Sequence, residues 1–418
     1  MKSEGVHTDT RTITKNSIFF CLKGANFDGN KFAAEALEKG AAFVVIDNKD
    51  YFIDDRTILV DDVLLALQNL AREHRRMFQI PIIGITGSNG KTTSKELIST
   101  VLSKKYNVHY TKGNLNNHIG VPLTLLQLNS NHEIAVIEMG ANKPGDIKEL
   151  AEIAEPTHGI ITNIGRAHLE GFKSLEGVIN TKTELYRFIE SVNGELFVNA
   201  ADQTLTEQLP ATVKVTKYNG PELSGELITL NPFVVMKWMK LGYESSELAT
   251  NLVGEYNYIN FLAAICIGNH FEVPEEQMNQ AIVTYVPSNN RSQVTKTENN
   301  TVIVDCYNAN PTSMESALKS FAAIPEHAKI FILGDMREMG TDAEFVHQEV
   351  LQQTIDLRLS GFFIGEEFLK LKGQHPQAIF LKTTEPLIEH FKQNPPKDLL
   401  ILLKGSRGIA LENVLPYL

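Results

Sequence analysis

The segment from residue 81 to residue 102 constrains the fold more than any other part of the chain. It joins a short apolar run to a helical run through the glycine-containing turn GITGSNGKTT at residues 84–93. Backbone N–H groups in such a turn, together with the positive end of the following helix, bind phosphate. The strict phosphate-loop spacing needs glycine at position 85, where this chain has isoleucine, so the segment matches a shorter variant of the loop. We therefore predict a nucleotide-phosphate site, with an ordinary glycine turn before a helix as the alternative.

The residue types in this turn suit the parts of a nucleotide and its metal ion. Lys91 is long enough to reach the outer phosphates, and the hydroxyl of Thr92 is a ligand for Mg²⁺. Gly87 and Gly90 permit the close approach and the unusual dihedral angles that a phosphate loop needs. The predicted nucleotide-binding residues of the turn are Gly87, Ser88, Asn89, Gly90, Lys91, Thr92 and Thr93.

Apolar strand-like runs alternate with helical runs along most of the 418 residues, which predicts an α/β fold built on mainly parallel sheets. A chain of this length is expected to form two or three domains. We predict a small α/β N-terminal domain at 1–80, a central ATPase-like P-loop domain with a parallel sheet at 81–287, and a doubly wound, Rossmann-like C-terminal domain at 288–418. Residues 201–253 are expected to form a smaller antiparallel patch, and the polar, turn-rich stretch 287–300 marks the second boundary.

The composition argues against several classes of protein. A formal net charge of −11 argues against duplex nucleic acid as a partner. No apolar run reaches the roughly 20 residues needed to span a bilayer, and the N-terminus has no apolar stretch typical of a signal peptide. The three cysteines, Cys21, Cys266 and Cys306, are far apart and odd in number, which disfavours a disulfide framework and a cysteine zinc site. We therefore expect a cytoplasmic protein with no nucleic-acid partner and no membrane insertion.

Three polar side chains beyond the loop are candidates for the reaction itself. Glu138 belongs to the strand-like run 133–139, and open α/β sheets bind ligands at the carboxyl ends of their strands. His168 follows the run 158–164, and a neutral imidazole can bind a metal ion or position a carboxylate. Lys182 lies on an expected amphipathic helix. Taken singly, these residues could also be a solvated strand-end carboxylate, a structural histidine and a surface lysine.

The motifs occur in an order that resembles the Mur ligases of peptidoglycan synthesis over nearly the whole chain. The matching segments are TDTR at 8–11 with DG at 28–29, the phosphate loop, TKGNLNNHIG at 111–120, EMGA at 138–141, TNIG at 162–165 and GEYNYIN at 254–260. YNANPTSM at 307–314, GDM at 334–336 and KGSR at 404–407 resemble the members that add D-alanyl-D-alanine to UDP-N-acetylmuramoyl-tripeptide. Thr10 departs from the usual serine, and Asn290 from the usual glycine before Arg291.

This resemblance implies an ATP-dependent ligase that uses Mg²⁺ and forms an amide bond through an acyl phosphate. It implies a catalytic set of Lys91, Glu138, His168 and Lys182, the last as a carbamylated lysine, and metal ligands Thr92, Glu138 and His168. The implied ATP contacts outside the loop are Asn257, Asn260, Arg291 and Asp305. The implied substrate contacts are Asp9, Arg11, Asp28, Gly29, Asn114, Asn116, Asn117, Thr162, Asn163, Tyr307, Asn308, Asp335, Lys404, Ser406 and Arg407. The first domain would bind the uridine nucleotide, the third would bind the dipeptide and part of ATP, and we expect a monomer.

Other functions remain open at this point. An amino-acid-adding Mur ligase usually has a histidine-containing segment where this chain has YNANPTSM, and a folylpolyglutamate-synthase-like ligase would not need the uridine-nucleotide segment. A GTPase-type nucleotide switch needs a guanine-reading NKxD-like element after the loop, whereas the only NKD here is upstream, at 48–50. A non-catalytic scaffold would not need Lys91, Thr92, Glu138 and His168. For Cys306, Met314, Met336 and His347 the sequence favours packing roles.

Overall fold

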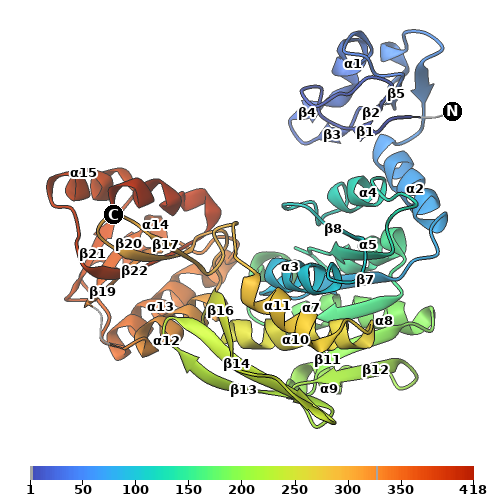
Figure 1. The fold of residues 1–418 in the computed structure, drawn as a ribbon. Helices are drawn as coiled ribbons and strands as arrows, with labels where there is room; N and C mark the ends of the chain where they lie inside the picture. The colour runs from blue at the N-terminus through green and yellow to red at the C-terminus, as the bar shows by residue number, and fades with distance from the viewer. Residues whose placement is uncertain (1–2, 326–327) are drawn as a thin grey trace.

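The computed structural model describes residues 3–325 and 328–418, which form three sheet-containing domains in chain order (Figure 1). The N-terminal domain stands at the upper right of this view, the central domain lies below it, and the C-terminal domain lies at the left, beside the central domain. The predicted α/β class with parallel sheets is confirmed. None of the helices in the described part of the chain combines the length and apolarity that crossing a bilayer requires.

The N-terminal domain is a small parallel sheet with one helix against each face. Its elements are β1 (Val6–His7), β2 (Ile18–Phe20), β3 (Lys23–Gly24), β4 (Phe27–Asp28), α1 (Ala33–Glu38), β5 (Phe43–Ile46), β6 (Thr57–Leu59) and α2 (Val63–Arg76). The sheet has the order β1-β2-β5-β6. Side chains alternate along a strand, so Phe19 and Val44 pack with α1 whereas Phe20 and Val45 pack with α2. The exit helix α2 then leads into the central domain.

The central domain is a six-stranded parallel sheet covered by helices on both faces. Its elements are β7 (Ile82–Thr86), α3 (Lys91–Leu102), β8 (Val108–Tyr110), α4 (Gly120–Leu125), β9 (Ile134–Glu138), α5 (Asp146–Ala154), β10 (His158–Ile161), α6 (Leu169–Phe172), α7 (Leu175–Lys182), α8 (Glu184–Ser191), β11 (Glu195–Asn199), α9 (Gln203–Glu207) and β12 (Lys214–Tyr218). The strand order is β12-β11-β10-β7-β9-β8, and every pair is parallel. Both faces are buried, which explains why β7 and β9 are apolar at nearly every position.

An antiparallel sheet and two helices complete the central domain. The elements are β13 (Leu223–Leu230), β14 (Phe233–Lys240), β15 (Tyr243–Glu244), β16 (Leu248–Val253), α10 (Tyr256–His270) and α11 (Glu275–Thr284). Strand β14 pairs with the other three, so the predicted antiparallel patch is confirmed for 223–253, although β12 joins the parallel sheet. The indole of Trp238 is buried and donates to Asn279 Oδ1 at 2.7 Å, which fixes β14 against α11.

The C-terminal domain is a second α/β unit with helices on both faces. Its elements are β17 (Gln293–Lys296), β18 (Thr301–Asp305), α12 (Pro311–Ala323), β19 (Ala328–Gly334), α13 (Ala343–Asp356), β20 (Gly361–Ile364), α14 (Glu366–Lys370), β21 (Ala378–Leu381), α15 (Glu385–Gln393) and β22 (Leu399–Lys404). The order is β17-β18-β22-β19-β20-β21, and only β17 is antiparallel to its neighbour. The stretch 287–300, predicted as a turn-rich boundary, also contains strand β17, which is polar because it lies at the sheet edge.

Candidate active site

A cleft of about 1150 Å³ lies between the central and C-terminal domains. The carboxyl ends of β9 and β18 contribute Glu138 and Asp305 to it, and the end of β22 contributes Lys404. Open α/β sheets bind ligands at this position. The predicted site residues that line the cleft are Ser88, Asn89, Gly90, Lys91, Thr93, Asn114, Asn116, Asn117, Glu138, Asn163, His168, Asn257, Asn260, Arg291, Asp305, Tyr307, Asn308 and Lys404. The structure therefore brings most of the predicted set together.

The phosphate loop is held in shape by the loop that follows β10. The amide of Ser88 donates to Asn163 O at 3.0 Å, and the amide of Asn89 donates to Asn163 Oδ1 at 3.0 Å. The hydroxyl of Thr162 donates to Asn89 O at 2.6 Å. A Cβ on Gly87, whose φ is +146°, would lie 2.0 Å from Thr162 Oγ1, so this position requires glycine. Thr162 and Asn163, predicted as substrate contacts, thus support the loop here, and only Asn163 also lines the cleft.

Glu138 forms a buried polar cluster directly beneath the loop. Its Oε1 accepts from the hydroxyl of Thr92 at 3.1 Å and from Nδ2 of Asn116 at 2.8 Å. Its Oε2 is buried and has no hydrogen-bond partner among the described residues, although Nζ of Lys95 lies 3.8 Å away. Because Glu138 is only 1% exposed, the alternative of a solvated strand-end carboxylate is wrong. A hydroxyl beside a carboxylate with one free oxygen fits the oxygen ligands that Mg²⁺ prefers.

Two lysines near this cluster have depressed pKa values. Nζ of Lys91 donates to Gly87 O at 2.7 Å, and burial lowers the pKa of Lys91 to about 8. Lys182 is 1% exposed, so the surface-lysine alternative is wrong. Burial, followed by the charge of Lys91, holds the pKa of Lys182 well below its usual value. Its Nζ lies 5.4 Å from the centre of the Phe172 ring.

His168 joins the central domain to the C-terminal domain across the cleft. It has a φ of +51° just before α6, and its Nδ1 pairs with Oε2 of Glu338. This hydrogen bond lowers the pKa of Glu338. In this arrangement His168 lines the cleft but contacts a carboxylate of the other domain, while Thr92 and Glu138 contact each other. The metal-ligand role of His168 therefore stays a prediction.

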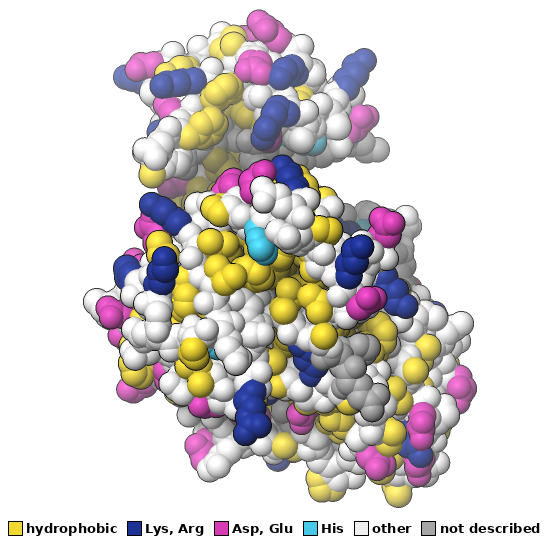
Figure 2. All heavy atoms as spheres, turned by 90° about the vertical axis from the view of Figure 1, so that its left-hand side faces the viewer, with side chains coloured by type: hydrophobic (Ala, Val, Ile, Leu, Met, Phe, Trp, Pro, Cys, Tyr) yellow, Lys and Arg dark blue, Asp and Glu magenta, His cyan; other side chains and the backbone are white. Residues whose placement is uncertain are grey.

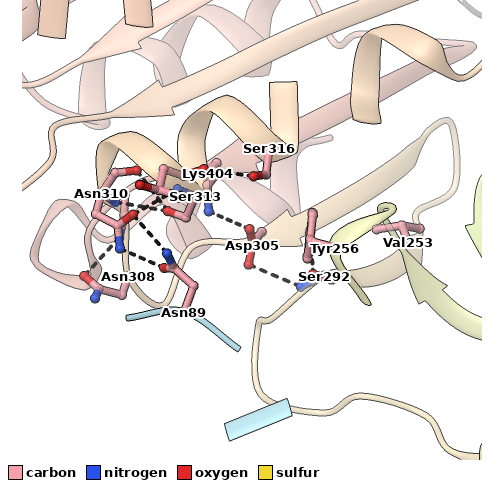
Figure 3. Close-up of polar contacts among 12 residues, drawn as sticks. Asn89, Val253, Tyr256, Ser292, Asp305, Asn308, Asn310, Ser313, Ser316 and Lys404 are labelled. Carbon is pink, nitrogen blue, oxygen red and sulfur yellow. Dashed lines mark hydrogen bonds and ion pairs between the residues drawn. The ribbon is translucent and has the colours of Figure 1, made fainter. Parts of the chain in front are cut away.

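The C-terminal wall of the cleft is a chain of polar contacts (Figure 3). Lys404 is 1% exposed and its Nζ lies 2.6 Å from Oδ2 of Asp305, whose Oδ1 accepts from the amide of Ser292 at 3.3 Å. Nδ2 of Asn310 donates to Oδ1 of Asn89 at 2.8 Å, so the C-terminal domain contacts the phosphate loop directly. Lys404 is therefore a buried residue of the cleft wall rather than a solvated surface lysine.

Two further groups of predicted ATP contacts lie at the same cleft. On α10, Asn260 donates to Oδ1 of Asn257 at 2.9 Å and accepts from the hydroxyl of Ser94 at 3.1 Å. The guanidinium of Arg291 lies over the Tyr307 ring, 4.0 Å from its centre. Because the net charge is negative, an anionic ligand would be attracted by such local cations rather than by the surface as a whole. Figure 2 shows Lys and Arg interspersed with Asp and Glu over one face, without a large area of one sign.

The remaining predicted residues lie outside the cleft lining. Asp9 and Arg11 pair with each other in the N-terminal domain, which lowers the pKa of Asp9 to about 2, and Asp28 and Gly29 lie in the same domain. Asp335 accepts from the backbone amides at the start of α14, and the hydroxyl of Ser406 accepts from the amide of Arg337. Arg407 is exposed. Thr92 and Lys182 are buried behind the cleft.

Sequence reasoning missed one residue of the Glu138 cluster. Lys95 is 1% exposed, and its Nζ lies 3.8 Å from Oε2 of Glu138. Its signal in the sequence is the spacing from Lys91, because residues four apart lie on one face of a helix. A second lysine on that face is therefore expected near the same carboxylate.

The chain is similar to known proteins along its whole length. Residues 2–75 match the model of the Mur ligase family catalytic domain, 85–268 the Mur ligase middle domain, and 290–407 the Mur ligase glutamate ligase domain. The chain is 34% identical to the UDP-N-acetylmuramoyl-tripeptide–D-alanyl-D-alanine ligase of Bacillus subtilis (strain 168), over 98% of this chain and 92% of that protein. A crystal structure of MurF from Acinetobacter baumannii has a TM-score of 0.90 and 28% identity, covering 99% of this chain and 92% of that one. The MurF ligase from Thermotoga maritima, solved in complex with ADP, has a TM-score of 0.89 and 25% identity, covering 100% and 98%.

Proposed function

The chain belongs to the Mur ligase family, and from that premise we propose how its parts join D-alanyl-D-alanine to UDP-N-acetylmuramoyl-tripeptide with ATP. The terminal carboxylate of the tripeptide attacks the γ-phosphate of ATP, which forms an acyl phosphate and releases ADP. The amine of the dipeptide then displaces phosphate and forms the amide. The observation that carries this assignment is the Thr92–Glu138 pair buried beneath the phosphate loop, at the meeting point of two domains. The family models that match this chain are those of Mur ligases, and they do not support the alternative of a GTPase-type nucleotide switch.

The three domains divide the substrates between them. The N-terminal domain binds the uridine nucleotide through Asp9, Arg11, Asp28 and Gly29. The central domain binds ATP and the acid, and the C-terminal domain binds the dipeptide and part of ATP. A monomer as the active unit stays a prediction. The cytoplasmic location expected from the sequence stays a prediction.

Residues of this chain fit a magnesium site at the base of the loop. Glu138 and Thr92 would hold the ion, since Oε2 of Glu138 is buried without a hydrogen-bond partner in the described structure. When bound, Mg²⁺ neutralises charge on the transferring phosphoryl group. His168 would join these ligands after exchanging its contact with Glu338.

The chain's own groups position the reactants and exclude water. Lys91 would leave the carbonyl oxygens of Gly87 and Ser88 and pair with the outer phosphates of ATP. The Asn89–Asn310 hydrogen bonds hold the C-terminal domain over the loop. Closure of this kind protects an acyl phosphate from hydrolysis, so amide formation outcompetes the attack of water.

Lys182 supports the proposal of a carbamylated lysine. Burial and Lys91 both lower the pKa of its amine, so the neutral form can attack CO₂. The nitrogen lone pair forms the N–C bond, the π bond of one C=O breaks and its electrons move to that oxygen, and the nitrogen loses a proton to leave an anionic carbamate. Intact-protein mass spectrometry in bicarbonate should show a gain of one CO₂ that Lys182→Met lacks and that acid reverses. A wild-type mass without this adduct would contradict the modification.

An omission series tests the function. Phosphate release and the mass of the ligated product should require ATP, Mg²⁺, UDP-N-acetylmuramoyl-tripeptide and D-alanyl-D-alanine together. Lys91→Ala should abolish product formation while far-ultraviolet circular dichroism stays unchanged. Lys392→Ala, which removes a half-exposed lysine on α15, is the matched control and should retain wild-type turnover. Phosphate release that ignores the dipeptide would contradict the proposal.

A further inference from the structure

Two histidines and a glutamate meet at the edge of the central sheet that lies opposite the cleft. His158 begins β10, Glu195 begins β11, and the parallel register pairs these two residues directly. His270 ends α10, which packs against the same sheet face through Ile160 and Phe197. One nitrogen of each imidazole and one oxygen of Glu195 lie within 4.8 Å of one another. Within residues 3–325 and 328–418, no other group of His, Cys, Asp and Glu meets in this way.

Neighbouring hydroxyl groups orient two of these three side chains. Oγ1 of Thr157 lies 2.9 Å from Nδ1 of His158 and can donate its own proton to the Ile82 carbonyl oxygen at 3.2 Å. Nδ1 of His158 then carries a proton, and its Nε2 presents a lone pair. On β12, the hydroxyl of Thr216 donates to Oε1 of Glu195 at 2.5 Å, and Oε2 remains a further acceptor. Partners that orient ligands in this way are typical of metal sites.

The spacing and the accessibility of these side chains suit a small divalent ion. Nδ1 of His270 lies 3.5 Å from Oε1 of Glu195. Two ligands about 2.1 Å from zinc at the tetrahedral angle are about 3.4 Å apart, so this pair is already at ligand spacing. The nitrogen of His158 lies within 4.8 Å of both atoms and would move closer on binding. The side chains of His270 and Glu195 are 25% and 21% exposed, so an ion can reach them.

We propose that His158, Glu195 and His270 bind a divalent transition-metal ion of the zinc class, at a site separate from the catalytic cleft. Two nitrogen ligands and one carboxylate are a donor set that Zn²⁺ accepts, with water in the fourth position. The ion would fasten the last residue of α10 to β10 and β11. Because the first turns of α10 carry Asn257 and Asn260 in the cleft, the metal would stabilise a helix that lines the active site.

Metal binding to the full-length, chelator-treated protein tests this site. Titration with Zn²⁺ alone, without nucleotide or Mg²⁺, should show one ion per chain. Co²⁺ alone should give the intense visible absorption of a four-coordinate site. His158→Gln and Glu195→Gln should each weaken Zn²⁺ affinity at least about tenfold, while turnover with Mg²⁺ stays at the wild-type level. His390→Gln, which changes an exposed histidine on α15, is the matched control and should bind Zn²⁺ as the wild type does.

Each other outcome overturns the proposal. Wild-type protein that binds no stoichiometric Zn²⁺ would show that His270 and Glu195 form only the side-chain pair seen here. Equal affinity in the wild type and both variants would place the ion elsewhere. Binding that is lost in Glu138→Gln but kept in His158→Gln would place the ion in the catalytic cleft. If His158→Gln does not fold, Glu195→Gln carries the comparison, because glutamine keeps an acceptor for Thr216.

Discussion

Lys95 tests how the chain accommodates a buried carboxylate beneath the phosphate loop. Its Nζ lies 3.8 Å from Oε2 of Glu138, and both side chains are 1% exposed. Two unit charges at this distance attract by about 4 kcal/mol at an effective dielectric constant of about 20. Removing one member of a buried pair costs about 3–5 kcal/mol, because the other charge is left uncompensated. Glu96 also lies 3.8 Å from Lys95, but it is more exposed and contributes less.

We expect Lys95→Met to lower the free energy of unfolding of the central domain by about 3 kcal/mol. Glu138→Gln keeps an acceptor for Thr92 and Asn116, and it removes the charge that needs Lys95. The double variant should therefore lose about 1–3 kcal/mol less than the sum of the two single variants. Urea unfolding followed by fluorescence of Trp238 measures this, because the chain has one tryptophan and it is buried in the central domain.

The Lys95–Glu138 pair also predicts how Mg²⁺ changes the stability of the protein. Lys95 competes with a metal ion for Oε2 of Glu138, so Mg²⁺ should stabilise Lys95→Met more than it stabilises the wild type. Additive single variants, within about 0.5 kcal/mol, would refute the coupling between Lys95 and Glu138. Equal stabilisation of both proteins by Mg²⁺ would show that the ion does not use this oxygen.

Three other predictions follow from the site. Gly87→Ala should lose at least about 2 kcal/mol of stability and most activity, because its Cβ would lie 2.0 Å from Thr162 Oγ1. The control Gly373→Ala, at a residue with a φ of +92° and nothing within 4 Å of the added Cβ, should lose only about 1 kcal/mol of stability and no activity. Equal losses of the two variants in unfolding and turnover assays would refute the steric argument. The ratio kcat/KM for ATP should fall above pH 8, because Lys91 has a pKa of about 8 and loses its charge there, and Lys91→Arg should remove this decline. The free energy of unfolding should instead rise between about pH 8 and 10.5, because there the unfolded chain, whose lysine has the usual pKa of 10.5, binds more protons than the folded chain. Profiles of kcat/KM and of stability that stay flat well above pH 8 would contradict these two statements. Asp335→Ala should lower the free energy of unfolding of the C-terminal domain by about 1–2 kcal/mol in urea, because Asp335 accepts hydrogen bonds from two backbone amides at the start of α14. A raised KM for the dipeptide without this loss of stability would show that Asp335 binds the substrate instead.

The parts of the fold that could be predicted are those with a strong local pattern. Strands β7 and β9 are buried on both faces, so each appears in the sequence as an uninterrupted apolar run. Strands β8 and β21 were missed, since each is short and lies at a sheet edge. Strand β17 was missed because an edge strand tolerates polar residues, and its hydrogen bonds come from β18 rather than from its own side chains.

The residues of the site that could be predicted also lie next to a strong local sequence pattern. The phosphate loop and Glu138 could be found because each follows an apolar strand within a few residues. The packing roles favoured for Met314 and His347 are confirmed, because both side chains are buried. Contacts between domains could not be found, since Asn89 and Asn310 are 221 positions apart and only the docking of two independent sheets brings them together.

Transfer of oxygen-18 from the substrate tests the central claim most directly. In the proposed reaction, one oxygen of the tripeptide's terminal carboxylate becomes bonded to the γ-phosphorus and leaves with phosphate, and the other stays in the new amide. With both carboxylate oxygens labelled, mass spectrometry should therefore find one label in each molecule of released phosphate and one in the product. Phosphate that carries no label, released together with ligated product, would contradict the acyl phosphate and with it the role proposed for this cleft.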